Sequence, residues 1–280
     1  MGIFSKKDEL SGAHYRALVC CAIPIAANLG TKDLLLPYPK IKPEFAAKTL
    51  ESWDVKDGTT AIAAMESFCS AQAHNPIVSE IFDNIIQKNQ YEIIRGIFTP
   101  IKQNDLLGLN LAQNFIKLWK SITNNANEDI EAFTDYLANP AENITFHNIT
   151  QSVVLNRINT GVAGYERTIR SLIVFGCSMD EITKITNFCA WDLGRTGFVA
   201  KMSVAAGFID SDTAWKYMLK AGDDAYKTYI SWRQFLAAYF LGRGMALTQK
   251  EQEIGEFGDI IGYLLKHKKS PYRISPLKFQ

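Results

Sequence analysis

Apolar residues recur at helical spacing along most of this chain, and few segments show the alternation of a half-buried strand. The clearest stripe follows Asn75 and Pro76, a typical helix start, and consists of Ile77, Val78, Ile81, Phe82, Ile85 and Ile86. A chain of 280 residues with 47% hydrophobic residues can bury a large core. The sequence therefore predicts an all-α, compact multi-helix domain of about eight to ten helices.

A cluster of three prolines between residues 37 and 43 favours an extended connector near the N-terminus. We therefore expect residues 1–44 to form an N-terminal helical appendage with a Pro-rich connector. Residues 45–280 would form the helical domain, with a basic C-terminal tail around residues 266–269. Such a run of charges is typical of a solvated segment rather than of a phosphate-binding arm.

The apolar segment from Ala17 to Leu29 is too short to cross a bilayer as a helix. A buried N-terminal helix is the preferred interpretation. The segment could cover the domain, mediate association or make a peripheral contact with a membrane surface, and the sequence leaves these alternatives open.

Charge and cysteine usage narrow the classes of function. Lys and Arg number 30 against 29 Asp and Glu, so the chain lacks the broad basic footprint of a nucleic-acid-binding protein. The five cysteines contain no Cys-x-x-Cys pair, which argues against a disulfide framework or a zinc site and favours a cytoplasmic protein. The four histidines are scattered, and no Walker, dinucleotide or Gly-x-Ser-x-Gly motif occurs, so we expect no metal and no cofactor.

Several local signals predict where helices begin and end. Asp57 is a plausible N-cap, and Ser178 with Glu181 fits a capping box that should open a long helical stretch. That stretch should end near Gly207, and Ser211 should begin the cap and first turn of the next helix. The small residues from Gly161 to Gly164 favour helix packing over a phosphate cradle, because no strand is predicted before them.

Two clusters about forty residues apart supply the candidate site. The first contains Trp191, Asp192 and Arg195, and the second contains Trp232, Tyr239 and Arg243. Helical spacing places Asp192 and Arg195 on one face, so the carboxylate could receive Arg195, Arg243 or both. Such a cluster is either a buried ion-pair network that fixes two helices or an arginine-lined pocket for an anionic ligand. A cavity connected to solvent and reaching either arginine would favour the ligand.

These clusters resemble the bacterial family known as domain of unknown function 1266. The resemblance rests on Ala190-Trp191-Asp192-Leu193-x-Arg195, on Ala206-Gly207-Phe208-Ile209 before a helix with Trp215, on Ser231-Trp232 leading to Gly242-Arg243, and on Ser52-Trp53-Asp54-Val55. It covers roughly residues 45–248 and leaves out the C-terminal tail. It implies a bacterial, mostly helical protein without an established activity, and it carries over no catalytic residue.

The sequence favours a non-catalytic interaction or accessory module, with another protein as the expected partner. The alternative is an enzyme or toxin-like effector that acts on a small anionic or phosphorylated substrate. In that case Arg195 and Arg243 would stabilise charge and Asp192 would position them. The sequence leaves the choice between enzyme and module open.

Overall fold

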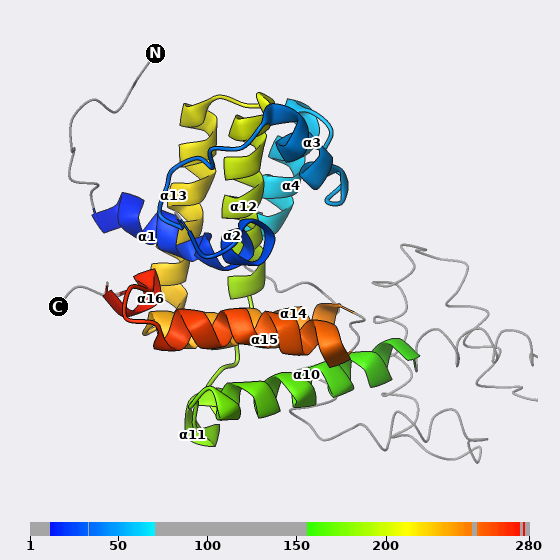
Figure 1. Ribbon diagram of the computed structural model, residues 1–280, viewed down its shortest axis with the longest axis vertical. Coiled ribbons are helices and arrows are strands. Elements are labelled where there is room, and N and C mark those ends of the chain that lie inside the picture. Colours follow the sequence, from blue (N-terminus) through cyan, green and yellow to red (C-terminus); the bar gives the residue numbers. More distant parts are fainter. Residues whose placement is uncertain (1–11, 33, 71–155, 248–250, 275–276, 278–280) are drawn as a thin grey trace, which may run out of the picture.

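The computed structural model describes residues 12–32, 34–70, 156–247, 251–274 and 277. Every regular element in these ranges is an α-helix, which confirms the predicted all-α class (Figure 1). The helices are α1 (Gly12–Cys20), α2 (Ala22–Leu29), α3 (Pro43–Glu51), α4 (Gly58–Ser70), α10 (Asn156–Val174), α11 (Met179–Thr183), α12 (Ala190–Ala206), α13 (Ser211–Thr228), α14 (Trp232–Ala246), α15 (Glu251–Lys266) and α16 (Pro271–Ile274). The stripe predicted from Ile77 lies outside the described residues.

Helix α12 is the centre of the fold. It contacts α13 and α4 along its sides, α3 near its C-terminal end, and α1, α2 and α14 elsewhere (Figure 1). Its apolar and small residues lie on all sides rather than on one stripe, which is typical of a fully buried helix. Almost all of its first fourteen residues are buried. Side chains from α12 can therefore be held rigidly by neighbours on several sides.

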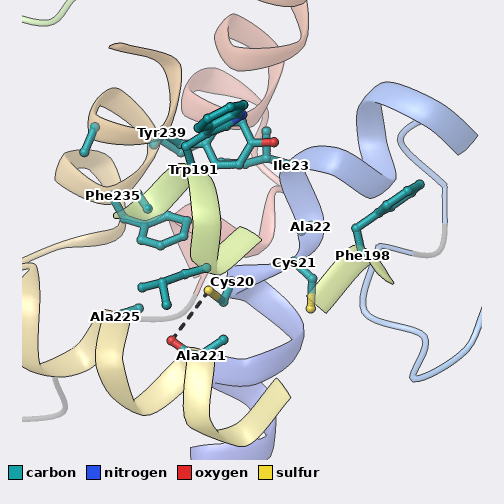
Figure 2. Close-up of a cluster of buried hydrophobic side chains, with 14 of the residues drawn as sticks. Cys20, Cys21, Ala22, Ile23, Trp191, Phe198, Ala221, Ala225, Phe235 and Tyr239 are labelled. Carbon is teal, nitrogen blue, oxygen red and sulfur yellow. Dashed lines mark hydrogen bonds between the residues drawn. The ribbon is translucent and has the colours of Figure 1, made fainter. Parts of the chain in front are cut away.

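The two N-terminal helices pack into the same core. Residues 17–23 are almost completely buried, so in this structure the apolar segment covers the body of the protein. The Cys20 thiol lies 3.8 Å from the carbonyl oxygen of Ala221 on α13, as Figure 2 shows. Pro24 stands in the first turn of α2, where its missing N–H breaks no helical hydrogen bond. The proline-rich connector then leads to α3, which begins at Pro43.

The C-terminal segment combines exposed basic residues with apolar residues that are buried. The Tyr272 hydroxyl of α16 donates a hydrogen bond of 2.6 Å to the Val19 carbonyl of α1, and Leu277 is buried. Arg273 donates to the Lys266 carbonyl at the end of α15. The side chains of Lys266, Lys268, Lys269 and Arg273 are exposed, whereas Tyr272 and Leu277 supply apolar surface that the core covers.

Helix caps agree in part with the sequence signals. The Ser178 capping box is present, Asp57 accepts a hydrogen bond from the Thr60 amide, and Gly207 ends α12 in the left-handed conformation. Asp210 rather than Ser211 caps α13, because its carboxylate accepts the Thr213 amide at 2.7 Å. Each cap satisfies an amide that a helix start leaves without a partner.

The predicted long helix after Ser178 is wrong. Helix α11 ends at Thr183, and α12 begins only at Ala190. The Tyr229 hydroxyl, from the end of α13, binds this irregular segment. It donates to the Asn187 carbonyl at 3.0 Å and accepts the Ala190 amide at 2.9 Å. This tertiary contact satisfies backbone groups that a continuous helix would otherwise pair.

A close crossing joins α10 to α14. A Cβ on Gly164 would overlap the backbone carbonyl of Gly244, and the Thr168 hydroxyl donates to the Gly164 carbonyl at 2.7 Å. The small residues from Gly161 to Gly164 thus serve helix packing, as the sequence predicts.

Candidate functional site

Asp192 and Arg195 form an ion pair in the first turns of α12. They stand three residues apart and so share one face of the helix. Asp192 is 3% exposed, and the Arg195 side chain is 15% exposed. The carboxylate is therefore inside the protein, and the guanidinium reaches the surface only in part.

Two aromatic rings hold the Arg195 guanidinium. Its central carbon lies 3.6 Å from the centre of the Trp191 ring and 4.1 Å from that of Phe68 on α4. Cation–π contacts of this kind favour a fixed, planar guanidinium. Arg195 is thus held by rings from two helices and by Asp192, which leaves it little rotational freedom. No sequence signal pointed to Phe68, because its contact with Arg195 joins residues far apart in the chain.

Tyr239 and Arg243 lie one turn apart on α14 and share Phe257 of α15. The Tyr239 ring stacks on Phe257 with 6.0 Å between ring centres, and the Arg243 guanidinium lies 4.0 Å from the Phe257 ring centre. Tyr239 also meets α12, since a Cβ on Gly194 would come within 2.6 Å of its ring. The approach of α12 and α14 at Gly194 thus joins the two sequence clusters.

Burial raises the pKa of Tyr239 to about 12, and the nearby guanidinium groups of Arg243 and Arg195 lower it only in part. Asp192 acts in the same direction as burial. The phenol therefore keeps its proton at neutral pH and is available as a hydrogen-bond donor rather than as a base.

Trp232 does not join the other five candidate residues. It begins α14 and packs edge-on against Phe235 and Tyr272, with ring centres 5.4 and 5.7 Å away. Its seven-residue spacing from Tyr239 keeps both on one helical stripe, but it also separates them by about 10 Å along the axis. The sequence analysis counted Trp232 as part of the candidate site, but Trp191 and Phe68 are the rings that lie against Arg195.

An open cavity of about 670 Å³ reaches both arginines, and we name it the α12–α14 cavity. Exposed residues such as Ser52, Asp54 and Leu247 line it, so it is connected to solvent. Its size is that of a pocket for a small organic molecule. Its lining residues are Pro24, Ala27, Asn28, Ser52, Trp53, Asp54, Phe68, Trp191, Arg195, Tyr239, Arg243, Leu247, Glu256, Phe257 and Ile260.

The lining is aromatic and carries charges of both signs. Arg195 and Arg243 are the cationic side chains among the described lining residues, and Asp54 and Glu256 are the anionic ones. Asn28 and Ser52 add neutral polar groups, and α2 supplies one wall. This lining combines apolar surface with a few polar groups that could orient a ligand.

The described residues contain no group of three or more His, Cys, Asp or Glu side chains placed to hold a metal ion. His14 packs against Trp215 and His267 against Tyr263, whereas His74 and His147 lie outside the described ranges. Within the same ranges, no helix has the length and apolar character to cross a membrane.

Comparison with known proteins gives a family but no activity. The family model described as "Protein of unknown function (DUF1266)" matches residues 50–277, most of the chain. The match includes the C-terminal segment that the sequence resemblance had left out. No curated protein and no solved structure matches the chain.

Proposed function

The chain belongs to the DUF1266 family of proteins of unknown function, and we propose that it binds a small organic anion in the α12–α14 cavity. One observation carries the proposal: an open cavity reaches two guanidinium groups, those of Arg195 and Arg243. A solvent-connected cavity that reaches either arginine favours a ligand over a purely structural cluster.

The contacts that hold the two arginine side chains in place support an anionic ligand. Trp191, Phe68 and Asp192 hold Arg195, and Phe257 covers one face of Arg243. Guanidinium groups fixed in this way lose little conformational entropy when an anion binds. They can also donate paired hydrogen bonds to a carboxylate or phosphate.

The remaining lining suits the organic part of such an anion. The rings of Trp53 and Phe257 supply apolar walls, and the protonated Tyr239 hydroxyl adds a neutral donor. A free inorganic ion would leave most of this cavity unfilled. The proposed ligand therefore carries a carbon skeleton, preferably with a ring that can stack on aromatic side chains.

We favour binding over catalysis, in agreement with the accessory module that the sequence predicts. The raised pKa of Tyr239 keeps its proton in place. An enzyme acting on a phosphorylated substrate is the second candidate, because Arg195 and Arg243 could also stabilise charge during phosphoryl transfer.

Isothermal titration calorimetry with 4-nitrophenyl phosphate tests the proposal. The wild type should bind this probe, and Arg243→Gln should weaken binding about tenfold because a charge-assisted hydrogen bond is lost. Arg243→Lys keeps the charge but not the paired donors, so its affinity for the probe should lie between those of the wild type and Arg243→Gln. Arg170→Gln is the matched control, since Arg170 is exposed on α10 and outside the cavity.

The same mixtures report on catalysis, because hydrolysis of the probe releases coloured 4-nitrophenolate. Binding without colour supports a binding module, whereas colour that Arg243→Gln abolishes supports the enzyme. The proposal is wrong if the wild type does not bind the probe, or if folded Arg243→Gln protein binds it as tightly as the wild type. Far-UV circular dichroism establishes that the variants are folded.

A protein partner and a cytoplasmic location remain predictions. The five cysteines are free and buried in the structure, which supports a reducing compartment. The described residues identify no particular protein partner.

A further inference from the structure

The α12–α14 cavity is not uniformly positive, and this feature bears on the kind of anion it would hold. Asp54 brings a carboxylate to the same cavity as Arg195 and Arg243. A ligand carrying negative charge throughout would meet attraction at the arginines and repulsion at Asp54. A ligand with charges of both signs could satisfy the two regions together.

A tight turn after α3 fixes the backbone at Asp54. The Asp54 amide donates to the Glu51 carbonyl and the Val55 amide to the Leu50 carbonyl, each at 3.1 Å. These two bonds define a Schellman turn, in which the residue at Asp54 takes the left-handed conformation, here with φ of 57°. Asp54 is the sole non-glycine residue with positive φ among those the structure describes.

A contact of Trp53, the residue before Asp54, shows where this turn lies along α12. Trp53 packs on Phe198 with 5.1 Å between ring centres. Phe198 follows Arg195 by three residues, so the turn lies about one helical turn beyond Arg195 in the direction away from the start of α12. Arg243 lies on α14. Helix α14 crosses α12 near Gly194, which is on the opposite side of Arg195 from Phe198 along α12. The lining therefore runs from an acidic turn to Arg195 and on to Arg243.

The Asp54 carboxylate has no hydrogen bond or ion pair with any residue that the structure describes. Glu256, the other lining carboxylate, already has an interaction. A cationic ligand group can therefore bind the Asp54 carboxylate without displacing a contact with another described residue.

We infer that the ligand is a zwitterion whose anionic group binds at Arg195 and Arg243 and whose ammonium group contacts Asp54. This inference rests on the proposed function and adds the second charged group. Candidate molecules are aryl or alkyl phosphates and carboxylates that carry a primary amine a few bonds from the anionic group.

Two matched probes test the inference. Tyramine phosphate, esterified at its phenol oxygen, carries an aryl phosphate and an ammonium group; 4-ethylphenyl phosphate has the same aryl phosphate without the amine. The ratio of their dissociation constants, measured by isothermal titration calorimetry, isolates the contribution of the ammonium group. The wild type should bind tyramine phosphate about threefold more tightly, since a solvent-exposed ion pair contributes modestly.

Asp54→Asn should abolish this preference while binding of 4-ethylphenyl phosphate is retained or strengthened. Asparagine tolerates the left-handed conformation as aspartate does, so the turn should persist without the charge. Glu51→Gln is the control, because it removes an exposed carboxylate on α3 that does not line the cavity. It should leave the preference unchanged.

The outcomes separate the two proposals. If both probes bind with equal affinity, or if Asp54→Asn keeps the wild-type preference, the zwitterion is overturned and the anion site stands. If neither probe binds, or if Arg243→Gln changes neither affinity, the anion site itself is wrong and the zwitterion fails with it.

Discussion

A single substitution tests whether Asp192 has a structural role. Its carboxylate is almost fully buried and pairs with a guanidinium that is itself largely enclosed. Asp192→Ala should lower the free energy of unfolding by about 3 kcal/mol, because Arg195 would keep its charge without its partner. Urea unfolding followed by circular dichroism measures this loss.

Asp223→Ala provides the comparison for that measurement. Asp223 also pairs with a cation on its own helix, Lys227, but both side chains are mostly exposed. Solvent screens such a pair, so its removal should leave stability nearly unchanged. Equal unfolding curves for the Asp192 and Asp223 variants would contradict the burial of the Asp192 ion pair.

Lys201 is a buried lysine that the sequence did not single out. It is 1% exposed, and its ammonium group donates to the Leu34 carbonyl at 3.3 Å. Burial lowers its pKa below 10.5, with a smaller opposite effect from Cys21. Below the folded-state pKa, lysine is charged in both states and its burial costs stability. Between that pKa and 10.5 only the unfolded chain holds the proton, so this cost decreases as pH rises.

Lys201→Met should therefore change the pH dependence of unfolding. The stability of the wild type relative to the variant should increase as pH rises from neutral towards 10.5. Lys48→Met, at an exposed lysine on α3, should show no such trend. Chemical unfolding at a series of pH values gives the comparison, and parallel curves for wild type and Lys201→Met would show that Lys201 titrates normally.

Single-residue roles were predictable where they depend on neighbours in the same helix. The three-residue spacing was sufficient to predict the Asp192–Arg195 pair. Phe68 and Phe257 were not predictable, because their contacts with Arg195 and Arg243 depend on how separate helices pack. Trp232 was misplaced because a shared stripe gives the direction of a side chain but not its distance along the helix.

At the scale of helices, glycine positions decide how closely α10 and α14 approach. Gly164→Ala should destabilise the protein by about 1–3 kcal/mol, because the new methyl group meets the Gly244 carbonyl. Gly255→Ala on α15 is the matched control, since a Cβ there has no neighbour within 4 Å. It should stabilise the protein by up to about 1 kcal/mol through helix propensity. Thermal unfolding of both variants tests this prediction. If Gly164→Ala is no less stable than the wild type, the close crossing is contradicted.

Most helices in the described ranges could be recognised from the sequence, but their limits depended on tertiary contacts. The Ser178 box began a helix as predicted, since the cap is a local interaction. The same helix ended early at Thr183, where Tyr229 binds the following backbone. Sequence periodicity carries no information about such a contact.

At the scale of the whole molecule, α1 and α2 complete the core although the family match begins after them, at residue 50. Removal of residues 1–42 would expose the surface of α12 and α13 that they cover, including Gly197 beside Cys21 and Gly222 beside Ala17. The shortened protein should bind the dye ANS and lose its cooperative thermal transition. Retention of the full-length melting temperature without dye binding would show that the two helices are dispensable.

The sequence predicted the all-α class, and from its two clusters the structure brings Trp191, Arg195, Tyr239 and Arg243 to one cavity. It did not predict that α2 and the turn at Asp54 complete this cavity. Those walls come from parts of the chain more than 130 residues before α12, and only the packed structure shows them together.

The five buried thiols can report where the folded protein opens, because a thiol reacts with an alkylating reagent only after it is exposed. Burial raises the pKa of Cys20, Cys21 and Cys177, among others, so alkylating reagents find little thiolate while the chain is closed. Departure of the N-terminal helices would uncover the first two, and separation of α11 from α14 would uncover the third. Mass spectrometry of timed iodoacetamide labelling would then reveal which region loosens first.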